Sequence, residues 1–93
     1  MKLNDTQVRV SLASIRKTFA AYIDSDEYAP KVLRGWDGHD TVIIWEDGAP
    51  YDWTILVNGG YDEFGTTYAP CTMPPGVHAE AVNGCVLALY RDK

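Results

Sequence analysis

Basic side chains are missing from most of this chain. None of its 8 Lys and Arg residues lies between residues 35 and 90. Binding to DNA or RNA phosphates needs a basic surface, so this absence argues against direct nucleic-acid binding. The same stretch holds most of the 13 acidic residues, namely Asp37, Asp40, Glu46, Asp47, Asp52, Asp62, Glu63 and Glu80.

Cysteines and long apolar runs are also scarce. Cys71 and Cys85 are too few for a disulfide scaffold, and we interpret both as reduced thiols. The longest apolar run covers residues 85–90, whereas a membrane span needs about 20 residues. No apolar leader follows the first residues. We therefore expect a cytoplasmic protein that does not engage a membrane.

Signatures of metal, cofactor or enzyme chemistry are absent as well. Cys71, His78 and Cys85 follow no known zinc-ligand spacing. The acidic run that starts at Asp24 begins like a calcium loop, but Ala29 stands where the loop needs Gly. There is no glycine-rich phosphate loop, no Ser nucleophile elbow and no His-Glu zinc helix. We expect a non-enzymatic protein without a cofactor or a metal.

The composition is that of one folded domain. The chain has 93 residues, of which 46% are hydrophobic and 23% charged, with a net charge of −5. These proportions are typical of a globular protein and not of a disordered one. A chain of this length buries enough surface for an ordinary core. We predict a single α+β domain over residues 1–93, in which an N-terminal amphipathic helix packs on a mostly antiparallel sheet of about 4–5 strands.

The helix is predicted from apolar residues spaced three and four apart. Asn4 is a favourable N-cap, and Gln7 three residues later completes a capping box. The helix is expected to end at residues 24–26, because Pro30 makes continuation beyond Ala29 unfavourable. The predicted core face carries Val8, Leu12, Ile15, Phe19 and Tyr22 or Ile23.

The rest of the chain favours strands. Residues 31–36 fit a short strand or one helical turn. β-branched and aromatic residues predict strands at 41–47, 51–58 and 64–68, the first two joined by a hairpin loop at 48–50.

Asn83-Gly84 predicts a two-residue type I′ hairpin between strands 77–82 and 85–90. That hairpin would place Val82 opposite Cys85 and Ala81 opposite Val86. The last strand is apolar on both faces, so we expect it in the middle of the sheet.

Aromatic residues alternate with the acids over residues 36–64. Exposed Tyr and Trp beside acidic groups suit a protein interface or a cation site. An aromatic-in, acid-out core pattern is the alternative for Trp45 and Trp53. The candidate partner-binding residues are Asp37, Asp47, Tyr51, Asp52, Tyr61, Asp62 and Glu63.

In size, charge and compactness the chain resembles the small acidic proteins of phages and mobile elements that inhibit host enzymes, including anti-CRISPR proteins. No motif carries this resemblance, so it transfers no site residues. It implies docking on a basic, nucleic-acid-binding surface of a host protein such as a CRISPR effector. Formation of a homodimer is also possible.

Other functions remain open. The acids could serve solubility alone, or be neutralised internally by Arg9, Arg16 and Lys17 of the helix. The chain could instead be a small-ligand module or a cysteine-dependent enzyme that uses Cys71 as nucleophile and His78 as base.

Overall fold

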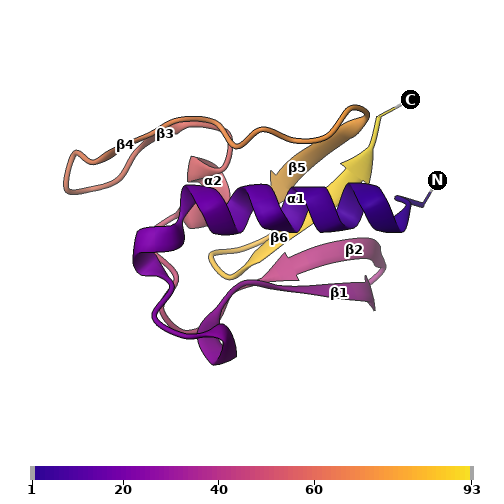
Figure 1. Ribbon diagram of the computed structural model, residues 1–93, viewed down its shortest axis with the longest axis horizontal. Helices are drawn as coiled ribbons and strands as arrows, with labels where there is room; N and C mark the ends of the chain where they lie inside the picture. The colour runs from indigo at the N-terminus through magenta and orange to yellow at the C-terminus, as the bar shows by residue number, and fades with distance from the viewer. Residues whose placement is uncertain (1, 93) are drawn as a thin grey trace.

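The computed structural model describes residues 2–92 and has an α+β fold, with α1 lying across a four-stranded antiparallel sheet (Figure 1). The strand order is β1-β2-β6-β5, which confirms that the C-terminal strand is interior. A separate two-stranded ribbon, β3-β4, extends from one end as an arm (Figure 1). The elements are α1 (Asp5–Thr18), 3-10 turns at Ala20–Tyr22 and Asp26–Tyr28, β1 (Lys31–Trp36), β2 (His39–Ile44), α2 (Trp53–Leu56), β3 (Gly60–Tyr61), β4 (Thr67–Tyr68), β5 (Val77–Ala81) and β6 (Val86–Arg91).

The N-terminal helix begins as predicted but ends early. The Asn4 side chain accepts a hydrogen bond from the Gln7 backbone, and the Gln7 side chain accepts one from the Asn4 backbone, which completes the capping box. The α-helix ends at Thr18 and not at residues 24–26. Phe19 leaves helical geometry with φ −105° and ψ 22°, which directs the following 3-10 turns away from the helix axis.

The prediction of a type I′ turn at Asn83-Gly84 is wrong. Neither residue has a positive φ. The Asn83 side chain instead accepts a hydrogen bond from the Cys85 backbone N–H at 2.8 Å, and a side-chain cap of this kind stabilises a longer turn. Ala81 therefore pairs with Leu87 and not with Val86. A one-residue slip of this kind exchanges the two faces of a strand. Leu87 and Leu89 consequently face the helix, together with Val77 and Ala79.

The strand predicted at 51–58 is also wrong. This segment forms the short helix α2, and residues 48–50 are not a hairpin loop. Trp53, Leu56 and Val57 are buried at positions i, i+3 and i+4, which is a helical spacing. The Trp53 indole N–H donates to the Gly84 carbonyl at 2.9 Å and joins α2 to the β5–β6 turn. Residues 31–36 form a strand, β2 ends at Ile44, and the strand expected at 64–68 is confined to Thr67–Tyr68.

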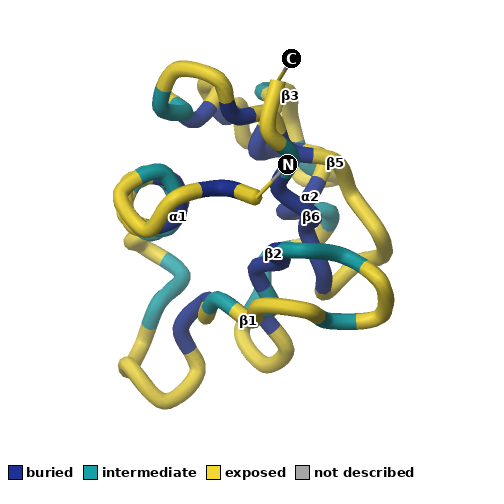
Figure 2. The backbone as a smooth tube through the Cα atoms, turned by 90° about the vertical axis from the view of Figure 1, so that its right-hand side faces the viewer, coloured by how far each residue is buried: buried dark blue, intermediate teal, exposed yellow. Residues whose placement is uncertain are grey.

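The main core lies between α1 and the sheet (Figure 2). At its centre Phe19 is fully buried, with its ring 5.9 Å from Trp45, 6.4 Å from Trp53 and 5.4 Å from Tyr68. Ring pairs at these separations add to the stability that burial of apolar area gives. A smaller cluster of Val42, Val86 and Ala88 lies on the opposite face of the sheet, under Trp36, Ile44 and Tyr90.

Truncation of Phe19 should cost far more stability than truncation of the other phenylalanine. Phe19→Ala should lower the free energy of unfolding by about 3–5 kcal/mol, because it empties the centre of the aromatic core. Phe64→Ala is the matched control, since Phe64 is 83% exposed and should lose less than about 0.5 kcal/mol. Chemical denaturation measures both. Equal losses in the two variants would contradict this description of the core.

Candidate functional site

Three acidic segments that are separate in the sequence lie toward the end of the molecule where α1 ends, in the left-hand part of Figure 1. The segments are the turns at 24–28, the loop 46–52 and the arm formed by β3 and β4. We call this region the acidic end. Its carboxylates belong to Asp24, Asp26, Glu27, Glu46, Asp47, Asp52, Asp62 and Glu63.

Two shallow hollows on either side of Tyr28 and Asp47 show that the first two segments meet. One hollow, of about 310 Å³, is lined by Tyr22, Asp24, Tyr28, Asp47 and Gly48, and we call it the tyrosine hollow. The other, of about 340 Å³, includes Glu27 and Glu46 and is bordered by one basic residue, Lys31. Residues 24–28 and 46–48 therefore form one continuous acidic surface.

The carboxylates of the acidic end form no ion pair with the basic side chains of residues 2–92. Across residues 2–92, the only ion pairs are those of His78 with Glu80 and with Asp92, on another part of the surface. Arg16 of α1 donates to the Pro30 carbonyl at 3.0 and 3.2 Å and not to a carboxylate. The helix cations therefore do not neutralise these acids by direct contact.

Exposed aromatic rings accompany these acids. Tyr28, Tyr51, Tyr61 and Phe64 are 50, 59, 77 and 83% exposed, respectively. Aromatic side chains, tyrosine among them, are enriched in protein interfaces relative to the rest of the surface. Trp45 and Trp53, by contrast, are buried, as the aromatic-in pattern predicts.

The arm is held to the body through Asp62. One oxygen of this carboxylate accepts hydrogen bonds from the backbone N–H groups of Phe64 and Thr66, each at 2.9 Å. Its other oxygen accepts from the Tyr68 hydroxyl, which also hydrogen-bonds the Tyr22 hydroxyl. Burial, together with the Tyr22 hydroxyl, raises the pKa of Tyr68 far above its usual value. Asp62 therefore has a structural role and is less free to meet a partner than Glu63.

Six of the seven candidate residues from the sequence lie in the three segments of the acidic end. Asp37 does not, because it occupies the β1–β2 turn at the opposite end of those strands (Figure 1). Asp52 is half-buried at the start of α2, with φ +52°. Sequence reasoning missed Tyr28 and the acids at 24–27. The acidic run is visible in the sequence, but it lies among the basic residues of the N-terminal third and outside the stretch 35–90 that lacks them.

Cys71 and His78 do not form a nucleophile–base pair. Cys71 belongs to the core on the helix side of the sheet, where its thiol donates to the Thr18 hydroxyl at 3.3 Å. Burial raises the pKa of this thiol, which disfavours the nucleophilic thiolate. His78 projects from the opposite face, where its ring stacks on Tyr90 and contacts Asp92. The pairing on which a cysteine-dependent enzyme would depend is therefore absent.

A row of rings crosses the sheet face away from the helix. Trp36 stacks on His39, His39 meets Tyr90 edge to face, and Tyr90 stacks on His78, with centroids 5.3–6.3 Å apart. The sequence analysis did not predict this row. The hairpin register that it predicted places Tyr90 and His78 on different faces of the sheet. Within residues 2–92, no three His, Cys, Asp or Glu side chains are arranged to hold a metal ion.

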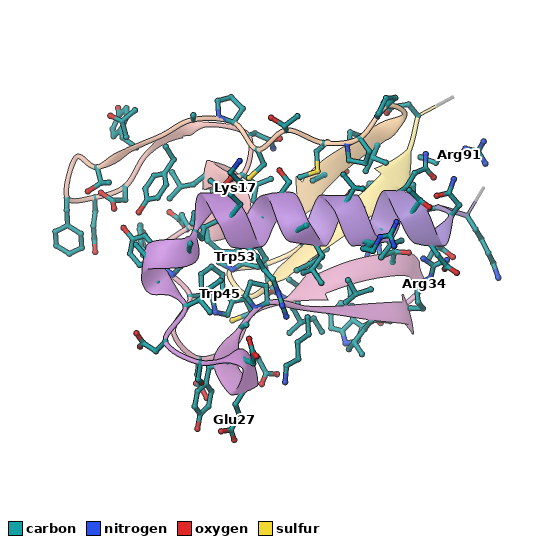
Figure 3. All side chains as sticks on the ribbon, viewed as in Figure 1. Lys17, Glu27, Arg34, Trp45, Trp53 and Arg91 are labelled. Atoms are coloured by element: carbon teal, nitrogen blue, oxygen red, sulfur yellow. The ribbon has the colours of Figure 1, made fainter. Side chains whose placement is uncertain are left out.

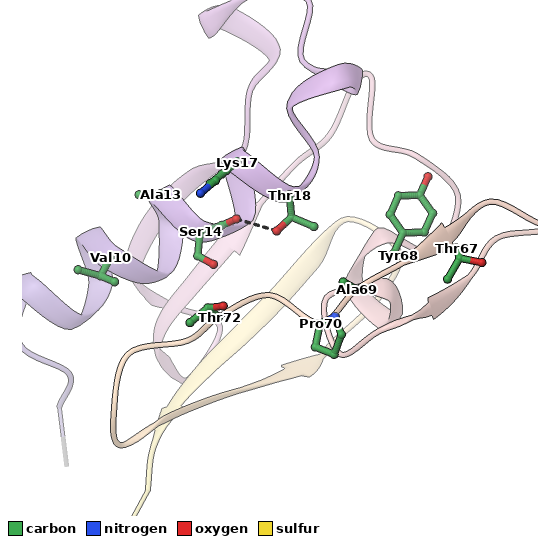
Figure 4. A pocket seen from close by; sticks show the side chains of 10 residues that line it. All are labelled: Val10, Ala13, Ser14, Lys17, Thr18, Thr67, Tyr68, Ala69, Pro70 and Thr72. Carbon is green, nitrogen blue, oxygen red and sulfur yellow. Dashed lines mark hydrogen bonds between the residues drawn. The ribbon is translucent and has the colours of Figure 1, made fainter.

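A third hollow, of about 630 Å³, lies between α1 and the segment that follows the arm (Figure 4). Val10, Ala13 and Ser14 line its helix side, and Ala69 and Pro70 line the other. Lys17 is its one charged side chain. Its lining has no carboxylate and is chemically distinct from the acidic end.

The chain matches no protein-family model, no curated protein and no solved structure. None of the helices within residues 2–92 is long and apolar enough to cross a bilayer.

The two thiols should differ sharply in reactivity. Cys85 is exposed in the β5–β6 turn and should react with a maleimide or with Ellman's reagent at neutral pH. Cys71 is buried and should react only after unfolding. Mass spectrometry of peptides after timed labelling measures both rates. Modification of Cys71 as fast as that of Cys85 would restore the case for a reactive cysteine.

The buried thiol should also make stability depend on pH. Its folded pKa is raised above the ordinary value of 9.0, so the folded state holds the proton more tightly than the unfolded chain does. The contribution is fully present below pH 9 and is lost as the pH rises above it. Denaturation midpoints should fall more steeply above pH 9 in the original protein than in Cys71→Ala, and parallel curves would contradict the assignment.

Proposed function

We propose that this protein is a non-enzymatic binding module that docks its acidic end on a basic surface of another protein. One observation carries the proposal: the acids of residues 24–28 and 46–48 form one surface beside the exposed Tyr28 ring, and they make no ion pair within residues 2–92. Like charges held together without counter-ions repel one another, which is unfavourable for folding alone. A basic partner would relieve that repulsion.

Charge and aromatic groups contribute differently to such docking. A surface field of one sign steers an oppositely charged partner and raises its association rate, an effect that salt weakens. Aromatic side chains at the centre of an interface slow dissociation instead. Tyr28, Tyr51 and Tyr61 are placed among the acids, so one end of the molecule offers both functions.

Nucleic-acid-binding proteins carry the basic surfaces that this end would fit best. A protein that covers such a surface prevents nucleic acid from reaching it, because both compete for the same Lys and Arg side chains. The sharpest form of the proposal is therefore an inhibitor of the phage or mobile-element type, acting on a host protein such as a CRISPR effector. A standard interface buries about 800 Å² per partner, a modest part of the 5722 Å² that this protein exposes.

Charge reversal at the acidic end tests the proposal. Glu27, Glu46 and Glu63 are exposed, and replacing all three with Lys changes the net charge from −5 to +1. The fold should survive, because exposed substitutions usually cost under about 0.5 kcal/mol each. Association with the partner should slow about tenfold or more at low salt. Each single Glu→Lys variant should slow association more than Glu80→Lys, which makes the same charge change on β5, outside the acidic end.

The partner is first captured from nuclease-treated lysate at low salt, then purified and measured by biolayer interferometry. It should be a basic protein, and added nucleic acid should compete for it. A partner that associates with the triple variant as fast as with the original protein would show that the acidic end only keeps the protein soluble.

A further inference from the structure

The tyrosine hollow differs from the rest of the acidic end in what surrounds it. Two tyrosines and two acidic residues line one concave site, namely Tyr22, Tyr28, Asp24 and Asp47 (the surrounding turns lie at the lower left of Figure 3). Its volume of about 310 Å³ is at the lower limit for sites that take whole small molecules. This size suits one amino-acid side chain better than a cofactor.

Trp45 lies behind the wall of this hollow. Gly48 lines the hollow, and a Cβ on it would lie 4.0 Å from the Trp45 indole nitrogen. The Trp45 side chain is 1% exposed and its indole N–H is closed to solvent. Trp45 can therefore report on what enters the hollow without contacting it.

The lining of the hollow favours a cation that is planar and has several donors. The two carboxylates accept hydrogen bonds from charged donors, and the exposed Tyr28 ring favours a cation on its face. Arginine meets both preferences, since its guanidinium has five donors and stacks on aromatic faces. Lysine supplies a compact charge but no planar group to stack.

We propose that the tyrosine hollow binds a single arginine of the partner, with its guanidinium on Asp24 and Asp47 and against the Tyr28 ring. This inference rests on the proposed function and names the residue of the basic partner that the acidic end recognises.

A defined probe tests the site without the partner. The full chain, labelled with nitrogen-15, is titrated with N-acetyl-arginine amide and observed by NMR. The backbone resonances of Asp47 and Gly48 and the indole resonance of Trp45 should shift with saturation. The citrulline analogue, which has the same shape without the charge, should leave them in place, and the lysine analogue should bind more weakly. Shifts spread over all exposed acids, or equal binding of the lysine analogue, would overturn the arginine assignment.

Matched variants locate the binding. Asp47→Asn and Tyr28→Leu should each weaken the probe about two- to fivefold, as the loss of one exposed ion pair or one cation–π contact does. Glu63→Gln and Tyr61→Leu make similar changes on the arm, outside the hollow, and should leave the affinity unchanged. Equal effects at both places would overturn the site. Should the arginine probe fail while Glu27, Glu46 and Glu63 still control association with the partner, this inference is wrong and the proposed function stands.

Discussion

Phe19 is fully buried, and its ring packs against Trp45, Trp53 and Tyr68. The arrangement of the acidic end depends on that packing. Phe19 caps α1, Trp45 follows β2, Trp53 starts α2 and Tyr68 ends the arm. Burial of the four rings in one cluster brings together segments that are far apart in the chain. The acids at 24–27, 46–52 and 62–63 lie just outside these rings, so the aromatic core determines where the negative charge gathers.

The same aromatic cluster also holds the arm in place and leaves the residues at its tip exposed. Tyr68 reaches from the core to Asp62 and Tyr22 through its hydroxyl and holds the arm in place. Glu63 and Phe64, just beyond Asp62, remain exposed. A surface supported in this way can meet a partner with little loss of conformational entropy, and preorganisation of this kind favours affinity. Buried Tyr68 thus holds in place the arm that carries the exposed Glu63 and Phe64.

Much of the fold could be predicted from local sequence signals. The capping box at Asn4 and Gln7 and the apolar spacing of Val8, Ile15 and Phe19 act within a few residues, and the structure confirms both. Apolar residues on both faces of the last strand correctly placed it inside the sheet. The wrong predictions concern segments in which two local signals point to different structures. Asn83-Gly84 is typical of a two-residue turn, but the Asn83 side chain stabilises a longer one. Residues 53–57 are rich in the β-branched and aromatic residues of strands, but their apolar spacing is helical.

The candidate site was harder to predict, because it depends on long-range packing. Counting charge along the chain found the acidic sheet half, and six of the seven chosen residues lie in the segments that form the acidic end. The count could not show that residues 24–28 fold back beside Asp47, since Phe19 and Trp45 bring them together through tertiary contacts. The charge count also could not show that Asp37 lies apart from the other candidate residues, because that depends on the turn between β1 and β2 lying at the far end of these strands.

Docking through the acidic end would make its charge act on the rate at which a basic partner associates. The most direct measurement is the association rate with the purified partner as a function of ionic strength, from about 10 mM to 1 M salt. Over this range the Debye length falls from about 30 to 3 Å. Electrostatic steering predicts that the association rate falls steeply with added salt while the dissociation rate changes little. An association rate that is independent of salt would contradict the account.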